Sequence, residues 1–231
     1  MTNELLSDFN NMWQQDIIKT MKLNKIFLLL FVTSCFYIQL QANDLIVKEI
    51  ERKDKNGPWP EFEVITTIEA TPLESVAIYY ALDYQKDYVP GVIKSEVIDQ
   101  PTPLEAITSY EFRTPWPLPN SSYINGSKLQ KVSDQTYQVN WWFISNSSAD
   151  DVFGSATFSP SPLGTKLVYR SYIAPKSALA GFFKNTASGD IAKTIYAIKN
   201  HIELLKQKES PILNKYKTKI LDALENKYTY K

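Results

Sequence analysis

Apolar and polar side chains alternate through residues 61–69. Phe62 and Val64 occupy one set of alternate positions and glutamates the other, which predicts a strand with one face on a core and one in water. The next residues, Thr71-Pro72-Leu73-Glu74, form a capping box with proline at the first helical position. A helix therefore begins there, and a second short helix is predicted around residues 83–88.

Strand patterning then repeats along the chain as far as residue 173, in runs rich in β-branched and aromatic residues. Residues 99–103 contain two prolines, so we interpret them as a turn. The predicted strands cover residues 92–98, 106–112, 123–132, 136–144, 154–158 and 165–173. With the first strand they make about seven, joined by short turns, which favours a curved and mostly antiparallel sheet.

A long amphipathic helix is the clearest periodic signal and follows the last predicted strand. Its apolar stripe is formed by Ile191, Ile195, Ile198, Ile202 and Leu205. Burying each of these side chains contributes about 1.5 to 3 kcal/mol, so the helix has to pack on a large surface. The curved sheet offers that surface, and the predicted class is α+β.

A further helix is predicted over residues 210–227, in a basic part of the chain. Residues 206–231 hold seven lysines and three acidic residues, which favours contact with an anionic membrane surface or a partner. The whole chain is neutral, with 25 basic and 25 acidic residues. Because nucleic-acid binding needs a clustered basic surface, we expect no nucleic-acid partner.

The N-terminal residues resemble a targeting signal. A short basic stretch from Met21 precedes an apolar run over residues 26–40, and Ala42 offers a small residue for cleavage. We therefore expect residues 1–42 to be an upstream segment and signal peptide (21–42), and the protein to be exported to a periplasm or secreted. Val32-Thr33-Ser34-Cys35 also resembles a lipobox, and lipidation of Cys35 would instead give a membrane-anchored lipoprotein.

Three local stretches carry a resemblance to a known family. They are Tyr88-Val-Pro-Gly-Val-Ile-Lys-Ser-Glu-Val-Ile98, Trp116-Pro-Leu-Pro-Asn120, and the passage from Phe158-Ser-Pro to Ile173-Ala-Pro175. In their order along residues 45–206 they resemble the START-like lipid-binding superfamily, which includes polyketide cyclase-like members. The resemblance implies a helix-grip fold, in which a curved sheet of about seven strands wraps around a long C-terminal helix and two small helices follow the first strand.

The domain boundaries follow from that resemblance. Residues 43–206 are expected to form the START-like domain, and residues 207–231 a basic C-terminal helical extension. The sequence departs from the family at two places: Ser121-Ser122 replaces the usual Arg-Asp, and Ala174 replaces a glycine. Loss of the charged pair favours a neutral or weakly polar ligand over one with a strongly charged head.

The resemblance implies a cavity between the sheet and the closing helix. Aromatic side chains recur at alternate strand positions on one side, where they either fill a core or line a pocket. Trp116, Phe182 and Phe183 are expected at the mouth, since loops carry function more often than strands. Arg113 and Arg170, with Asp83 or Glu111, are candidate polar anchors. The expected cavity residues are Tyr110, Phe112, Trp116, Tyr137, Trp141, Phe143, Phe158, Tyr169, Phe182, Phe183, Ile195 and Ile198.

Motifs for catalysis are absent from the sequence. His201 is the sole histidine and has no cysteine or second histidine to share a zinc ion, and no nucleophile elbow or cofactor fingerprint occurs. We therefore predict no catalytic residue, metal or cofactor. The expected function is that of an exported monomer that holds a hydrophobic small molecule, such as a lipid. The alternatives are a cyclase- or hydratase-like enzyme, or an envelope interaction protein with a collapsed cavity.

Overall fold

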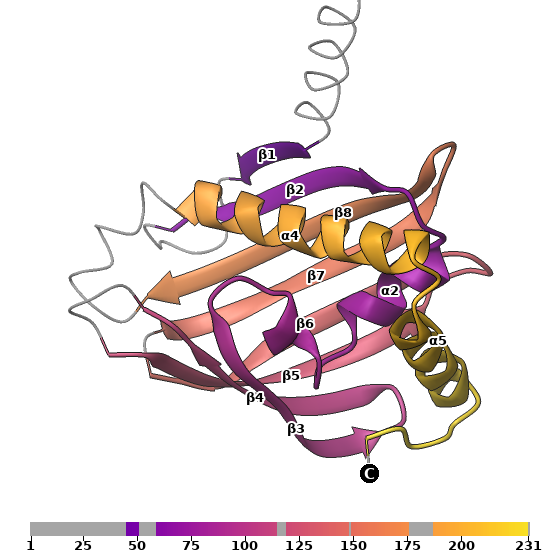
Figure 1. Ribbon diagram of the computed structural model, residues 1–231. Coiled ribbons are helices and arrows are strands. Elements are labelled where there is room, and N and C mark those ends of the chain that lie inside the picture. The colour runs from indigo at the N-terminus through magenta and orange to yellow at the C-terminus, as the bar shows by residue number, and fades with distance from the viewer. Residues whose placement is uncertain (1–44, 51–58, 115–118, 148, 176–186, 231) are drawn as a thin grey trace, which may run out of the picture. The chain divides into compact units, whose positions relative to one another are not determined.

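The computed structural model describes residues 45–50, 59–114, 119–147, 149–175 and 187–230. In these residues eight strands form a curved antiparallel sheet in the order β1-β2-β8-β7-β6-β5-β4-β3 (Figure 1). The strands are β1 (Leu45–Ile50), β2 (Glu61–Ile68), β3 (Val92–Thr102), β4 (Glu105–Phe112), β5 (Ser121–Lys131), β6 (Tyr137–Asn146), β7 (Ala149–Ser161) and β8 (Gly164–Pro175). The predicted α+β class and the antiparallel sheet are confirmed.

The described helices all lie on the same side of the sheet (Figure 1). They are α2 (Pro72–Tyr79), the 3₁₀ turn η1 (Gln85–Asp87), α4 (Ala187–Gln207) and α5 (Pro211–Leu224). α4 runs along β1 and β2, α2 packs on β6, β7 and β8, and α5 packs on α2. None of the helices in these ranges is long and apolar enough to cross a membrane.

The start of α2 confirms the predicted capping box. The Thr71 hydroxyl accepts a hydrogen bond from the Glu74 amide at 3.3 Å, and the Glu74 carboxylate accepts one from the Thr71 amide at 2.9 Å. Two backbone N–H groups that the helix leaves unpaired are satisfied in this way. The cap fixes where the chain leaves β2 and begins the helix that packs on the sheet.

The strand register defines the face of the sheet that looks toward the helices, which we call the inner face. Val64, Tyr169, Ala156, Val139 and Leu129 are successive cross-strand partners from β2 to β5. Because directly paired residues point to the same face, this row marks the inner face across the middle of the sheet. All of its members except Tyr169 are buried.

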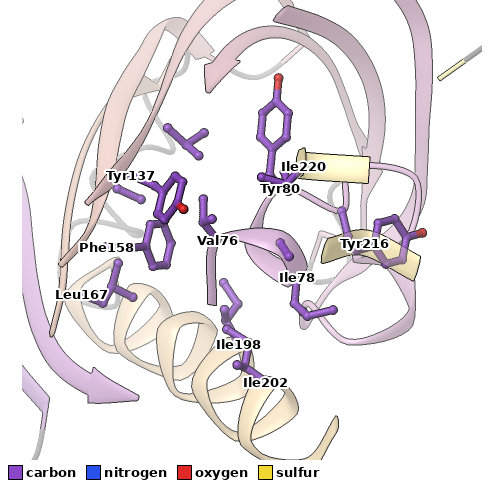
Figure 2. Packing of buried hydrophobic residues seen from close by; sticks show 14 of the residues in the cluster. Val76, Ile78, Tyr80, Tyr137, Phe158, Leu167, Ile198, Ile202, Tyr216 and Ile220 are labelled. Carbon is purple, nitrogen blue, oxygen red and sulfur yellow. The ribbon is translucent and has the colours of Figure 1, made fainter. Parts of the chain in front are cut away.

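The hydrophobic core lies where α2, α4 and α5 meet the inner face (Figure 2). α4 contributes Ile195, Ile198, Ile202 and Leu205, which confirms four of the five predicted stripe positions as buried. Leu213, Tyr216 and Ile220 of α5 belong to the same cluster. α5, which the sequence analysis assigns to a C-terminal extension, thus packs into the same hydrophobic core as α2 and α4.

Two strand predictions need correction. Residues 99–103 were predicted to be a turn, yet β3 continues to Thr102 through Pro101. β3 is the edge strand of the sheet, where a proline leaves no ladder donor missing on its open side. β7 likewise passes Pro160, because the pairing of β6 with β7 ends at Phe158 and frees that side of the strand.

β1 was not predicted at all. Its sequence, LIVKEI, has three apolar residues in a row followed by charged ones, so it lacks the period-two signal of a half-buried strand. It pairs with β2 at the other edge of the sheet. The predicted signal segment with Cys35, and Trp116, Phe182 and Phe183, lie outside the described residues.

Candidate ligand site on the inner face

Seven aromatic side chains were predicted to lie on one side of the strands. The register places all of them on the inner face: Tyr110, Phe112, Tyr137, Trp141, Phe143, Phe158 and Tyr169. Their role in ligand binding stays a prediction. They differ in how deeply they are buried, which divides them into two groups.

The first group belongs to the packed core. Tyr137 and Phe158 are buried there together with Ile195 and Ile198, two further residues expected to line a cavity. Figure 2 shows Tyr137, Phe158 and Ile198 among other apolar side chains, between the sheet and α4. For these four residues the structure favours the core-packing interpretation.

In the second group Trp141 and Tyr169 are partly buried and pack against that core, whereas Tyr110 is buried and Phe112 and Phe143 are partly buried without belonging to the core cluster. The Trp141 ring stacks on Tyr169 with centroids 5.2 Å apart, and Tyr79 of α2 approaches Trp141 at 6.4 Å and Phe158 at 5.2 Å. Trp141 covers Gly154, where an added Cβ would lie 2.2 Å from the indole ring. A glycine at this position is therefore what allows the indole to lie flat on the sheet.

Five phenol groups lie near one another at this place, four from different helices or strands and one from the loop that follows η1. We call them the tyrosine cluster: Tyr79, Tyr88, Tyr110, Tyr123 and Tyr169. Burial raises the pKa of each hydroxyl, and the neighbouring phenols raise the pKa of Tyr79, Tyr88, Tyr110 and Tyr123 further. All five therefore stay protonated near neutral pH and act as uncharged hydrogen-bond donors and acceptors.

Hydrogen bonds tie the segment that carries η1 to the cluster. The Tyr110 hydroxyl donates to the Gln85 side-chain oxygen at 2.8 Å, and the Gln85 amide nitrogen donates to the Tyr79 carbonyl at 2.9 Å. The Tyr88 hydroxyl donates to the Ile78 carbonyl at 2.6 Å. The loop between α2 and β3 is thus fixed against both the helix and β4.

The two arginines proposed as polar anchors do not join this site. Arg170 is exposed, and its guanidinium pairs with Glu63, its cross-strand partner on the outer face, at 2.6 Å. Arg113 is also exposed, just beyond the end of β4. The structure therefore does not bring either arginine to the inner face, and a role for them as anchors stays a prediction.

Charge is nearly absent from this part of the inner face. On β4, β5 and β6 the one charged side chain at a described inner position is Lys131, which is exposed at the end of β5. The described residues also hold no group of three or more acidic, histidine or cysteine side chains that could bind a metal ion.

The basic C-terminal residues are partly neutralised by the domain itself. Lys206 and Lys217 lie 3.9 and 3.6 Å from the Glu74 carboxylate, and Lys219 lies 3.4 Å from Asp83. Lys227 pairs with acidic residues of its own segment. These pairs reduce the positive charge that would face an anionic surface.

Sequence reasoning missed several residues at this site. Tyr79, Tyr88 and Tyr123 were read as parts of elements and not as site residues, and Thr108 and Asn125 received no role. The alternation of Thr108 with Tyr110, and of Tyr123 with Asn125, was visible in the sequence. What was missing is the register that pairs these two strands, since the residues joining β4 to β5 give no regular turn pattern.

Comparison with known proteins agrees with this architecture. The structure is similar to the STAR-related lipid transfer protein of Xanthomonas axonopodis, with a TM-score of 0.62 and 18% identity over 69% of this chain and 94% of that one. Human StAR-related lipid transfer protein 5 gives a TM-score of 0.60 and 11% identity, over 71% and 84% of the two chains. The lipid transfer and protein localization domain of human StarD13 gives 0.59 and 13%, over 68% and 84%.

No family model matches the sequence, and no curated protein matches it. At these identities the comparisons define the fold alone. The chain has the START-like helix-grip fold, with a curved, unclosed sheet of eight strands holding α4. The prediction drawn from the three local stretches is therefore confirmed at the level of the fold.

Proposed function

We propose that the protein binds an uncharged apolar small molecule, such as a lipid, between the inner face and the helices, and shields or transfers it. One observation carries the proposal. Tyr79, Tyr88, Tyr123 and Tyr169 keep partly accessible side chains, yet burial raises the pKa of each hydroxyl. Side chains that border an enclosed space keep some accessible surface although their hydroxyl groups are desolvated, whereas side chains of a filled core are desolvated and keep no accessible surface.

The chemistry of this face supports an uncharged ligand. Aromatic rings and aliphatic side chains supply apolar contact, and neutral phenols supply a few polar contacts, which is the usual composition of a small-molecule site. A charged ligand would lose its hydration and find only one described charge on the inner face of β4–β6, the exposed Lys131 at the end of β5. The solved structures of similar fold include proteins named for lipid transfer, which is consistent with this use of the fold.

Capture of ligand by the full-length protein tests the proposal. We expect native mass spectrometry of the purified chain to show a bound small molecule, and organic extraction to release an apolar compound. N-phenyl-1-naphthylamine, a neutral apolar dye, should bind with increased fluorescence and be displaced by that extract. A protein that carries no small molecule and does not bind the dye would contradict the proposal, and conversion of the extracted compound would favour the enzyme alternative.

Two adjacent tryptophans provide a matched pair for this experiment. Trp141 lies on the inner face against Tyr169, whereas Trp142 lies on the outer face over Gly126 and is 39% exposed. Trp141→Phe should change the dye affinity several-fold, because it alters an inner-face ring stack. Trp142→Phe should leave the affinity unchanged, and equal effects of the two variants would place the dye elsewhere.

Export is a separate part of the proposal and rests on the N-terminal pattern alone. We expect the chain to be recovered outside the cytoplasm of its host, shortened by the signal residues. Fractionation followed by N-terminal sequencing tests this, and a cytoplasmic chain that retains residues 21–42 would contradict it.

A further inference from the structure

Two polar atoms beside the tyrosine cluster are buried and have no hydrogen-bond partner among the residues that the structure describes. They are the Thr108 hydroxyl oxygen and the Asn125 side-chain oxygen, which we call the polar pair. Thr108 is 1% exposed. Buried polar groups are nearly always hydrogen-bonded in native proteins, because an unpaired one loses its hydration without compensation. Two such atoms side by side therefore call for a structural or functional explanation.

The polar pair occupies one place on the sheet. Thr108 of β4 and Asn125 of β5 are direct cross-strand partners on the inner face, which puts their Cβ atoms about 5 Å apart. A register shift in β6 falls opposite Asn125, where the pairing jumps from Ile124 with Ser145 to Asn125 with Phe143. Such bulges are frequent next to functional sites, where they redirect side chains.

The tyrosine cluster begins one pair further along the same two strands. Tyr110 and Tyr123 are also cross-strand partners, and their rings stack with centroids 4.9 Å apart. The Thr108 hydroxyl lies near enough to the Tyr110 hydroxyl to offset part of the rise in the pKa of Tyr110, but the two groups do not reach hydrogen-bonding geometry, and the Tyr110 hydroxyl donates its proton to Gln85. The polar pair thus borders the proposed ligand site, and no described residue of the protein forms a hydrogen bond with either atom.

We infer that the polar pair binds a hydroxyl group at the end of an otherwise apolar ligand, an inference that rests on the proposed function. A ligand hydroxyl donates one hydrogen bond to the Asn125 oxygen and accepts one from the Thr108 hydroxyl, so it satisfies both atoms at once. It also fits if the Asn125 amide is rotated, because a hydroxyl both donates and accepts. The ligand class is therefore a long-chain alcohol, a sterol or an acylglycerol with a free hydroxyl.

The same geometry disfavours an anionic ligand. With the Asn125 amide oriented as in the structure, a carboxylate or phosphate oxygen would face the Asn125 oxygen, which is itself an acceptor. The inner positions of β4 and β5 offer one cation, Lys131, which lies three alternate positions along β5 from Asn125. A recognition site for a charged head group needs paired or bidentate cations.

Thr66 provides an internal control. Its hydroxyl is also buried and has no partner in the described part of the chain, and the residue is 2% exposed on the inner face of β2. Its cross-strand partners are Leu45 and Leu167, so it lies among aliphatic side chains. It is on the same face as the polar pair but near the opposite edge of the sheet. Replacing either threonine by valine removes the same atom, but only Thr108 borders the tyrosine cluster.

Displacement of N-phenyl-1-naphthylamine from the full-length protein tests the inference. The competitors are 1-dodecanol, its isomer 1-methoxyundecane, which lacks the donor, and dodecanoate. We expect the wild type to bind the alcohol about tenfold more tightly than the ether, with dodecanoate weakest. Thr108→Val and Asn125→Leu should each remove most of that preference, whereas Thr66→Val and Thr108→Ser should keep it.

The outcomes separate this inference from the proposed function. Failure of the dye to bind the wild type would contradict both. Dye binding with equal affinities for alcohol and ether, with tighter binding of dodecanoate, or with no displacement by any competitor would overturn the hydroxyl site and leave apolar binding standing. Circular dichroism melting of each variant checks folding, and Asn125→Leu keeps the test valid should the Thr108→Val variant not fold.

Discussion

His201 is half-buried and packs against aromatic side chains. Its ring stacks on Tyr88 with centroids 4.6 Å apart and an interplanar angle of 1°, and its Nε2 lies 3.1 Å from the Tyr84 hydroxyl. Burial lowers the pKa of His201, and the nearby Asp87 carboxylate offsets part of that effect. The folded protein therefore holds the neutral imidazole.

This histidine predicts a pH dependence of stability. Because the pKa is lower in the folded state, the unfolded chain binds the proton more readily, so the contribution to stability is full above about pH 6.5 and decreases as the pH falls below it. Urea unfolding at pH 7.5 and pH 5.5 should show a larger loss of stability for the wild type than for His201→Gln. Equal losses in the two proteins would show that His201 takes up its proton equally in both states.

Among the elements, the helices were predicted more closely than the strands. The capping residues Thr71 and Glu74 and the isoleucine stripe of α4 are local signals, readable over one or two helical turns. Strand ends depend on neighbours that are distant in sequence: Pro101 is tolerated because β3 is an edge, and Pro160 because β6 ends early. No local pattern contains that information.

The C-terminal tail makes a contact of its own with the turn between β3 and β4. The Gln100 side-chain oxygen accepts hydrogen bonds from the backbone N–H groups of Thr229 at 3.1 Å and Tyr230 at 2.9 Å, and the Gln100 amide donates to the Pro103 carbonyl. The Tyr230 hydroxyl in turn donates to the Tyr80 carbonyl at 2.7 Å. One glutamine thus anchors the tail to the sheet edge.

Replacing that glutamine should release the tail. Gln100→Ala leaves two backbone donors unpaired, and we expect a loss of about 1 to 2 kcal/mol in unfolding free energy and of hydrogen-exchange protection at the Tyr230 amide. Gln130→Ala is the matched control, since Gln130 is exposed and bonds only Asn140 on the neighbouring strand among the contacts described. Unchanged protection at Tyr230 in the Gln100 variant would show that the tail is held by other contacts.

For the molecule as a whole, the order of elements was enough to predict the fold but not the site. The predicted order of strand, small helices, strands and long helix matches the structure, with β1 added. The tyrosine cluster draws Tyr79 from α2, Tyr88 from a loop and Tyr169 from the last strand, and their meeting depends on the curvature and register of the sheet. Alternation within one strand shows which residues share a face, but not what covers that face.

The role of α5 is the second property of the whole molecule that the sequence did not show. Leu213, Tyr216 and Ile220 are each at most 4% exposed and belong to the same cluster as α2 and α4. At about 2 kcal/mol for each buried side chain they contribute about 6 kcal/mol, which is comparable with the entire stability of many domains. Residues 207–231 should therefore be part of the folding unit.

Truncation tests that view. A chain that ends at Lys208 should lose cooperative unfolding and expose apolar surface, because Val76, Ile78 and Leu82 of the core would lose the helix packed beside them. A chain that ends at Lys227 removes only the tail contact, so it should unfold cooperatively with a stability close to that of Gln100→Ala. Thermal melting followed by circular dichroism compares the two. A shorter chain that melts cooperatively at the temperature of the full-length protein would show that residues 43–206 fold alone, as the sequence first suggested.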